Sequence, residues 1–516
     1  QRVTERTIFG PLGTIIKTIA AAPLPNLSPS CTYEEELYST DSEVPGSQHR
    51  IDGFLRLNKS TPSPAPKGSR TPTSDIAVNF EFKCSDKPKD IIDDHVQNRS
   101  KALYSAFHNL HSDCQCKHTY SMTIEDNHVC LWYFSRSHSA KSHQFDLLAD
   151  PVSQDVRAVV HALFALIFST VEDLGYNANI KCIPEWDEEV KQVQLRYVYR
   201  LGDRFFKTVK CCDEYDDLYI SGRVTRVWEV VEVTSFDDTA ALPNVQRMIL
   251  RDVWLDHNSG TEHEIQEKIF QHCNKLGRNF PSENDKCLHD VDDATRTLLH
   301  QRLEDGSYRE LFLTIKADYQ GATSKPRAEG FTPKPDIFAE PVYINQEAKM
   351  PGSDAQRASS SRSHTPVGLN LSMVFQQQAG APRGYKQKQR SFVVYEEHAS
   401  ALQILFLISW IHRDVSSGNI LFFKGRSKLC DLEYAKEFDL SVGGRSSDPK
   451  TGTPIFMAIE LLSNTPILNN LGFSEKIGVA GQLWTHSPPS QAIRHNFQHD
   501  LESIFWILAW LVFTHI

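Results

Sequence analysis

Residues 410–433, WIHRDVSSGNILFFKGRSKLCDLE, constrain the fold more tightly than any other part of the chain. Asp414 stands five residues before Asn419, and Asp431 follows twelve residues after that. Carboxylate and amide oxygens are the ligands that Mg²⁺ prefers, and protein-bound Mg²⁺ commonly holds phosphate as well. The apolar segment Ile420–Phe423 between them is strand-like, and Asp431 follows a second strand-like segment, Lys428–Cys430. The stretch therefore predicts a site for phosphate chemistry.

Length and composition bound the remaining possibilities. A chain of 516 residues is too long for one core, so two or three domains are expected. A net charge of −10 argues against a general binder of nucleic acid or anionic membrane. The most apolar run, Ile504–Phe513, is too short to span a bilayer and is expected to be a buried helix. Eleven scattered cysteines are typical of a reducing compartment, so we expect an intracellular protein, cytoplasmic or nuclear.

The first two hundred residues predict an α+β domain. Residues 1–45 mix Pro, Ser and acidic residues and are expected to be a poorly ordered lead-in. Strand-like alternation at Arg50–Leu57 and Ile76–Lys83, with an amphipathic helix at Ser153–Leu174, then indicates a domain over residues 46–205.

A compositional break divides the part that follows. Residues 320–390 are rich in Ser, Pro, Gly and Gln and bury too little apolar surface to fold alone, so they are expected to be a flexible insertion. A strand at Ser391–Glu396 and a helix at Ala399–Trp410 are expected after it. They lead directly into the stretch that contains Asp414.

That stretch has the catalytic-loop spacing of protein kinases. His412, Arg413 and Asp414 followed by Asn419 match the pattern H-R-D-x-x-x-x-N. In this chemistry Asp414 would accept the proton of the attacked hydroxyl, and Asn419 and Asp431 would hold metal ions on the phosphates. The later segments Gly452–Pro454 and Met457–Glu460 make a chance match improbable, because single motifs carry a false-positive risk that several in order do not.

With these motifs the chain resembles the fungal-type protein kinase family, a divergent branch of the protein-kinase-like fold. The resemblance rests on HRDVSSGNIL, CDLEYAKEF, TGTPIFMAIELL, HDLESIFWILAWL, GRVTRVWEV, MILRDVW and TEHEIQEKI, and less sharply on IEDNHVCLWYFSRSHS. It implies an α+β fold with a bilobal protein-kinase-like domain over residues 206–516. The small lobe would cover about residues 206–396, and residues 397–516 would form a large lobe that is incomplete because the chain is C-terminally truncated.

The resemblance also implies a function. The expected reaction is ATP-dependent transfer of the γ-phosphate to a protein hydroxyl, that of Ser or Thr, with ATP and Mg²⁺ as cofactors and a protein as substrate; oligomeric state is not predicted. Carried over by position, Gly222 represents the glycine-rich loop and Arg251 the lysine that grips the phosphates. Glu262 would be the ion-pair partner of Arg251, with Glu264 as second choice. Further positions carried over are those of the activation segment, Thr453 and Glu460, and the brace of the catalytic loop, Asp500.

Several departures leave a second hypothesis open. Arginine is longer and planar, so Arg251 is not a conservative replacement for a lysine at a packed phosphate site. A single glycine beside a β-branched residue is a poor phosphate cradle, and the segment from Tyr395 to His412 is short for the helices expected there. Leu432 and Glu433 replace the Phe and Gly of the usual Asp-Phe-Gly signature, and the resemblance implies that this replacement is typical of the family. The alternative is a pseudokinase or interaction module that binds nucleotide or partners without turnover.

A weaker alternative concerns the N-terminal domain. Asp52 on one strand with Glu81 and Lys83 on the next resembles the PD-(D/E)xK nuclease arrangement, in which carboxylates hold Mg²⁺. The favoured interpretation is an alternating strand whose polar residues face water. Nucleic acid is accordingly not an expected partner.

A cluster of potential zinc ligands occurs in HSDCQCKH. His111, Cys114, Cys116 and His118 lie within eight residues. Such tight spacing rarely lets four side chains reach one tetrahedral ion, so no zinc site is expected.

Overall fold

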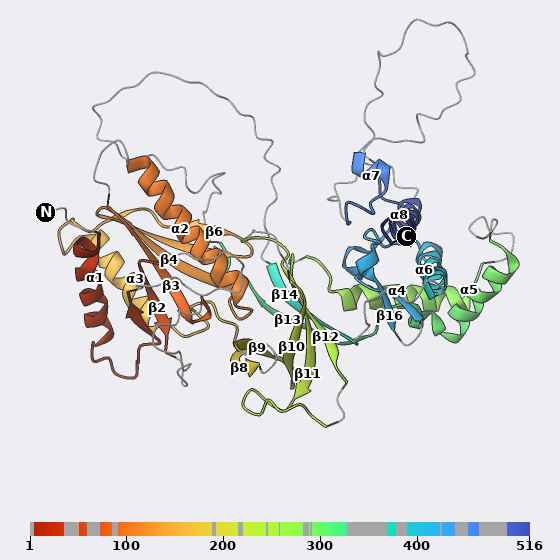
Figure 1. The fold of residues 1–516 in the computed structure, drawn as a ribbon, viewed down its shortest axis with the longest axis horizontal. Coiled ribbons are helices and arrows are strands. Elements are labelled where there is room, and N and C mark those ends of the chain that lie inside the picture. The colour runs from red at the N-terminus through yellow and green to blue at the C-terminus, as the bar shows by residue number, and fades with distance from the viewer. Residues whose placement is uncertain are drawn as a thin grey trace, which may run out of the picture. The chain divides into compact units, whose positions relative to one another are not determined.

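The computed structural model describes most of the chain outside several connecting segments. The described residues are 5–35, 51–58, 73–84, 91–187, 192–214, 220–243, 246–256, 258–281, 288, 291–327, 369–377, 390–423, 426–438, 452–463 and 493–515. They form two compact units (Figure 1). The first comprises residues 1–246, 252–258 and 319–373, and the second comprises residues 247–251, 259–318 and 374–516.

The first unit begins with a mixed sheet and three helices. The strand order is β1-β2-β3-β4-β5-β6, and β7 pairs with β5. Neighbours are antiparallel except for β3 and β4, which are parallel and are joined by the crossover helix α2. The elements are α1 (Glu5–Ala20), β1 (Cys31–Glu34), β2 (Gly53–Leu57), β3 (Ile76–Lys83), α2 (Ile91–Ser112), β4 (His118–Glu125), β5 (His128–Ser135), β6 (Ser139–Lys141), β7 (Phe145–Asp146) and α3 (Gln154–Phe168).

Alternation along β3 explains how this sheet is covered. Val78, Phe80 and Phe82 belong to one apolar cluster with residues of α1 and α3, among them Phe9 and Leu163. Each such buried side chain contributes about 1.5–3 kcal/mol. Asn79 and Glu81, which lie between them, point to the opposite face, because successive side chains alternate across a strand. That opposite face is covered by α2.

The N-terminal segment differs from the expected lead-in. Residues 5–20 form α1, whose Phe9, Leu12 and Ile16 are buried at helical spacing. Pro and Gly obscure this pattern in the sequence, whereas burial against the sheet stabilises it. Helix α3 is capped at Ser153 and ends at Phe168, earlier than the expected Leu174, because Ser169 has an extended backbone (ψ 153°).

A second sheet has the strand order β13-β14-β12-β11-β10-β9-β8. Its strands are β8 (Ile180–Asp187), β9 (Gln192–Leu201), β10 (Arg204–Glu214), β11 (Thr225–Val233), β12 (Met248–Asp256), β13 (Ile315–Thr323) and β14 (Leu369–Gln377). Strands β8 to β11 form one antiparallel meander. Residue 205, near which the sequence predicts the end of the N-terminal domain, lies in β10. Because β9 and β10 are hydrogen-bonded neighbours, that boundary would divide one sheet.

Helices dominate the second unit. Its elements are α4 (Glu262–Arg278), α5 (Asp293–Asp305), η2 (Ser307–Leu311), α6 (Arg390–Leu407), β15 (Trp410–Ile411), η3 (Ser417–Asn419), β16 (Ile420–Phe423), β17 (Arg426–Leu429), η4 (Leu432–Tyr434), β18 (Lys436–Glu437), α7 (Ile459–Ser463) and α8 (Phe497–His515). A single apolar cluster joins α4, α5, α6, the strands around residue 420 and α8. Helix α8 contributes Ile504 and Ile507 to it while Phe505 and Phe513 are exposed, so the expected buried helix is buried on one side.

One expectation about the middle of the chain is wrong, and another differs from the structure in part. The expected strand Ser391–Glu396 lies within α6, which runs on as one helix to Leu407. Strand β14 lies inside the expected insertion 320–390, because pairing within a sheet stabilises a segment whose composition alone is ambiguous. Residues 328–368 and 378–389 of that segment lie outside the described residues. Among the helices of the described ranges, none is both long enough and apolar enough to cross a membrane.

Two glycines with positive φ provide a test of the first unit's packing. A Cβ at Gly175 (φ 115°) would collide with the His118 carbonyl oxygen, whereas one at Gly202 (φ 60°) would meet no atom within 4 Å. We expect Gly202→Ala to cost about 1 kcal/mol for its backbone conformation alone. Gly175→Ala should cost at least twice that, measured by urea denaturation followed by tryptophan fluorescence. Equal losses in the two variants would contradict this packing.

Candidate active site

The loop after β15 is fixed by a buried carboxylate at the start of α8. The His412 N–H donates to Asp500 Oδ2 (2.7 Å), and the Arg413 N–H donates to Asp500 Oδ1 (3.0 Å). Although burial opposes it, the contact with the His495 ring (3.0 Å) keeps the pKa of Asp500 below its usual value. Arg413 itself has a left-handed backbone (φ 73°), which costs about 1–2 kcal/mol in a non-glycine residue. The two bonds to Asp500 offset this strain.

His412 connects this loop to the residue before Asp431. Its ring is buried, with Nε2 3.0 Å from the Cys430 carbonyl oxygen and Nδ1 accepting from the Asp414 N–H (3.3 Å). These partners assign the proton to Nε2, because a carbonyl oxygen can only accept. The Cys430 N–H in turn donates to the Asn419 carbonyl oxygen (3.1 Å). Asp414, Asn419 and Asp431 are thus held by one continuous set of contacts.

Asp414 is held at one carboxylate oxygen. Thr453 donates to Asp414 Oδ1 from its backbone N–H (3.0 Å) and its hydroxyl (3.2 Å). The Asn419 side-chain amide donates to the Asp414 carbonyl oxygen (2.8 Å). Because that bond uses the amide nitrogen, the side-chain carbonyl oxygen of Asn419 is the atom left to contact a cation. The role of Thr453 as a contact of Asp414 is not evident from its place in the sequence.

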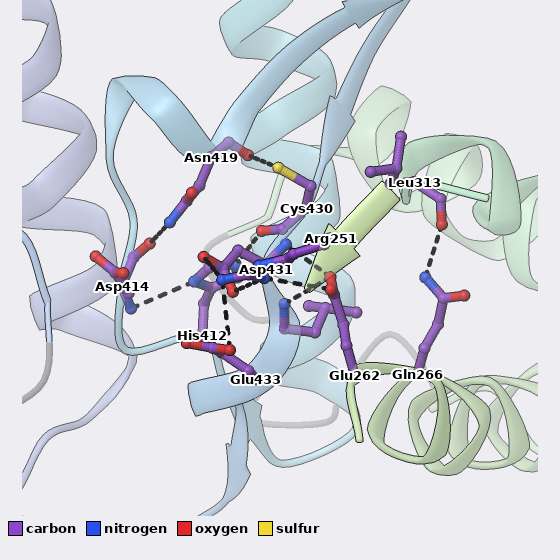
Figure 2. A network of polar contacts seen from close by, with 11 residues as sticks. Arg251, Glu262, Gln266, Leu313, His412, Asp414, Asn419, Cys430, Asp431 and Glu433 are labelled. Atoms are coloured by element: carbon purple, nitrogen blue, oxygen red, sulfur yellow. Dashed lines mark hydrogen bonds and ion pairs between the residues drawn. The ribbon is translucent and has the colours of Figure 1, made fainter. Parts of the chain in front are cut away.

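Arg251 on β12 gathers three carboxylates. Its guanidinium donates to both oxygens of Asp431, at 2.7 and 3.1 Å, and lies 3.4 Å from Glu262 Oε2 and 3.4 Å from Glu433 Oε2. Figure 2 shows the three carboxylates around this one side chain. Arg251 is 13% exposed, so most of the cluster is removed from water. A parallel pair of N–H···O bonds is the strongest form of such a contact.

The backbone around Asp431 is tied to the same cluster. Glu262 Oε1 accepts from the N–H groups of Asp431 (2.8 Å) and Leu432 (3.1 Å). Asp431 has a left-handed backbone (φ 63°), which this bonding stabilises. Burial, only partly offset by Arg251, raises the pKa of Glu262 to about 7. Burial works against the charge of Arg251 too, but the three carboxylates raise its pKa well above the usual value.

Helix capping explains why Glu262, and not Glu264, contacts Arg251. Glu264 takes part in a capping box, in which its Oε2 accepts from the Thr261 N–H (3.0 Å) and its own N–H donates to the Thr261 hydroxyl (3.2 Å). This use of Glu264 at the start of α4 directs Glu262 inward. The contact between Glu433 and Arg251 was missed by the sequence analysis. The sequence features that could have indicated this contact are the arginine in place of lysine at residue 251 and the extra carboxylate two residues after Asp431.

Gly222 belongs to the first unit, in the connection between β10 and β11. Its φ is 119°, and its N–H donates to the carbonyl oxygen of Arg136 (2.9 Å). The guanidinium of Arg136 is buried and donates to the Ile220 carbonyl (3.0 Å). Arg136, the residue that follows β5, therefore holds Ile220 and Gly222 of this connection.

Glu460 at the start of α7 contacts a histidine. Its Oε2 lies 3.3 Å from His499 Nε2, on the first turn of α8. Burial lowers the pKa of His499. The pair therefore links α7 and α8 through a hydrogen bond more than through opposite charges.

The potential zinc ligands are placed differently from a metal site. Cys114 and Cys116 are buried, and burial raises the pKa of both thiols above the usual range. A thiol must lose its proton to bind zinc. In the part of the chain that the structure describes, no three or more His, Cys, Asp or Glu side chains are grouped to hold a metal ion.

Comparison with known protein families gives one match. A family model described as fungal protein kinase matches residues 50–512. No curated protein matches the chain.

The brace at Asp500 makes a testable prediction. Asp500→Asn removes a charged acceptor from two backbone N–H groups and should cost about 2–3 kcal/mol. Hydrogen exchange at the His412 and Arg413 amides should accelerate accordingly. Asp293→Asn, at a side chain 97% exposed, is the matched control and should leave both amides unchanged. If the two amides exchange at the same rate in Asp500→Asn as in the control, Asp500 does not hold this loop.

Proposed function

The chain belongs to the fungal protein kinase family, and from this premise we propose that it transfers the γ-phosphate of ATP to a serine or threonine hydroxyl of a protein substrate, with Mg²⁺ as cofactor. The observation that carries the proposal is the continuous set of contacts joining Asp414, Asn419 and Asp431 through His412 and Cys430. Phosphoryl transfer needs little covalent work from the protein beyond such positioning.

Asp414 is proposed as the base. Thr453 occupies Oδ1, so Oδ2 is the oxygen that would accept the proton of the substrate hydroxyl as the hydroxyl oxygen attacks phosphorus. His412 and Arg413 act through the loop: their N–H groups anchor it on Asp500, and the His412 ring orients Asp414. Glu460 and Thr453 belong to the proposed activation segment.

The donor set fits the cofactors that the family implies. Asn419 offers a carbonyl oxygen and Asp431 a carboxylate, both hard oxygen donors suited to Mg²⁺. A carboxylate has about four lone-pair directions, and Arg251 uses two of those of Asp431. When bound, Mg²⁺ supplies positive charge to the phosphates. Arg251 would supply charge beside them, and Glu262 would orient Arg251.

One observation favours a second candidate, a pseudokinase that binds nucleotide or partners without turnover. Both Asp431 oxygens are bonded to Arg251, and a third carboxylate, Glu433, competes for the same guanidinium. A buried bidentate pair is costly to break, because separation would leave both charges without partners. In this candidate Arg251 neutralises Asp431 in place of a metal ion.

Phosphate transfer from [γ-³²P]ATP to a mixed protein substrate tests the proposal. Asp414→Asn should lower the transfer rate at least about 100-fold, because general-base catalysis contributes about 10²–10⁴-fold. ATP binding, measured by calorimetry, should be unchanged, since Asp414 is not expected to contact the nucleotide. Asp293→Asn serves as the control. An unchanged transfer rate in Asp414→Asn would overturn the kinase assignment.

Arg251→Lys separates the two candidates. Lysine cannot make the parallel pair of bonds to Asp431. If wild type is a working kinase adapted to arginine, the variant should lose transfer activity. If wild type transfers no phosphate and Arg251→Lys does, the pseudokinase candidate holds for this chain.

A further inference from the structure

Strand β3 in the first unit has a polar face that is buried. Its apolar residues pack toward α1 and α3, and the sequence predicts that the polar residues between them face water. Instead helix α2 covers them: Asn98 donates to the Glu81 carbonyl (3.4 Å), and Asn109 donates to the Ile76 carbonyl (3.4 Å). Asn79 and Glu81 are both 0% exposed. The interpretation of β3 as a strand with a wet polar face is therefore wrong.

Glu81 and Asn79 lack the partners that such burial requires. Glu81 Oε1 accepts from the Ser105 hydroxyl (3.2 Å), but no N–H or hydroxyl of the described residues donates to Glu81 Oε2. Within the same described part of the chain, neither side-chain atom of Asn79 has a hydrogen bond. A buried carboxylate oxygen without a donor costs several kcal/mol unless a cation or a proton neutralises it.

A second carboxylate and a lysine complete the cluster. Asp52, just before β2, accepts from the Phe82 N–H at Oδ2 (2.8 Å), which places it beside Glu81. Lys101 of α2 lies 4.0 Å from Asp52 Oδ2 and 3.9 Å from Glu81 Oε2, too far for hydrogen bonds. Asp52 and Glu81 thus lie side by side, with the Lys101 ammonium group 4.0 and 3.9 Å from them.

The cluster is open to solvent at one end. The side chains of Asp52 and Lys101 are 31% and 40% exposed, while that of Glu81 is fully buried. A hydrated ion can reach such a site from the Asp52 side. Lys83 is directed elsewhere: its Nζ lies 3.3 Å from Asp94 and 3.4 Å from Gln97. The lysine beside the carboxylates is therefore Lys101, which the sequence analysis did not identify.

We propose that Asp52 and Glu81 bind a divalent cation of the magnesium type, and that this site hydrolyses a phosphodiester bond of nucleic acid. Magnesium usually keeps several waters and takes one or two carboxylates, which is what this cluster offers. The ammonium of Lys101 beside the ion supplies the second positive charge that a phosphodiester anion requires. The site lies outside the residues assigned to phosphate transfer from ATP.

The hydrolytic step consumes one water. A water on the cation loses a proton to solvent, its oxygen forms a bond to phosphorus, and the bond from phosphorus to the departing sugar oxygen breaks. That oxygen takes a proton from solvent, so the products are a phosphate monoester and an alcohol. Glu81 and Asp52 hold the ion, and Lys101 contacts a non-bridging phosphate oxygen.

Mn²⁺ binding to the full chain, followed by electron paramagnetic resonance, tests the site. The Asp431→Asn background disables the other candidate metal site. In that background Glu81→Gln should weaken binding at least about tenfold. Asp52→Asn should do the same and serves as the second variant if Glu81→Gln fails to fold in a thermal unfolding control with EDTA. Lys83→Gln, on the same strand and face, should bind Mn²⁺ like the background. Equal binding in all variants would overturn the metal site.

Cleavage tests the chemistry of the bound ion. Supercoiled DNA and single-stranded RNA are incubated with the full chain and Mg²⁺ or EDTA. Cleavage of either should require Mg²⁺, fall at least about tenfold in Glu81→Gln and in Lys101→Met, and be unchanged in Lys83→Gln and Asp414→Asn. The last variant separates this activity from phosphate transfer. Mn²⁺ binding with no cleavage of either nucleic acid would overturn the hydrolytic part of the proposal.

Discussion

The contact between Arg251 and Asp431 is the interaction on which the second unit's site depends. A buried guanidinium is costly unless carboxylates match it closely, and here three of them do. The contact ties β12 to the segment after β17, and Glu262 extends the tie to α4 through two backbone N–H groups. The left-handed backbone of Asp431 is sustained by the same bonds. Removing the arginine would leave several buried negative charges without a partner.

Glu81, a buried carboxylate of the first unit, is less completely paired than those around Arg251. Glu81 is as deeply buried as Glu262, but the only cation near it, among the described residues, is Lys101 at 3.9 Å, and one of its oxygens has no donor. A structural carboxylate is normally paired, as Glu262 is. The two buried glutamates therefore differ in their partners: Glu262 belongs to an ion-pair cluster, whereas Glu81 has one hydroxyl donor and a lysine 3.9 Å away.

Local signals in the sequence predicted the parts of the candidate site that lie close together in the chain. The spacing of Asp414, Asn419 and Asp431 is compatible with one loop and one strand return, and the family resemblance is shown over residues 50–512. What depends on distant pairing was not predictable. Strand β14 is stabilised by its neighbours in the sheet, and the polar face of β3 is buried only because α2 covers it. Lys101 and Glu433 were missed for the same reason, since their partners are brought near by folding.

The most direct test of the role of Asp431 is the effect of Mg²⁺ on ATP affinity, measured by calorimetry on the full chain. If Asp431 holds the cofactor's cation while Arg251 contacts the phosphates, Mg²⁺ should tighten ATP binding at least about tenfold, which corresponds to about 1.4 kcal/mol. ATP affinity that is the same in Mg²⁺ and in EDTA would contradict the account, because it would mean that Arg251 alone neutralises Asp431.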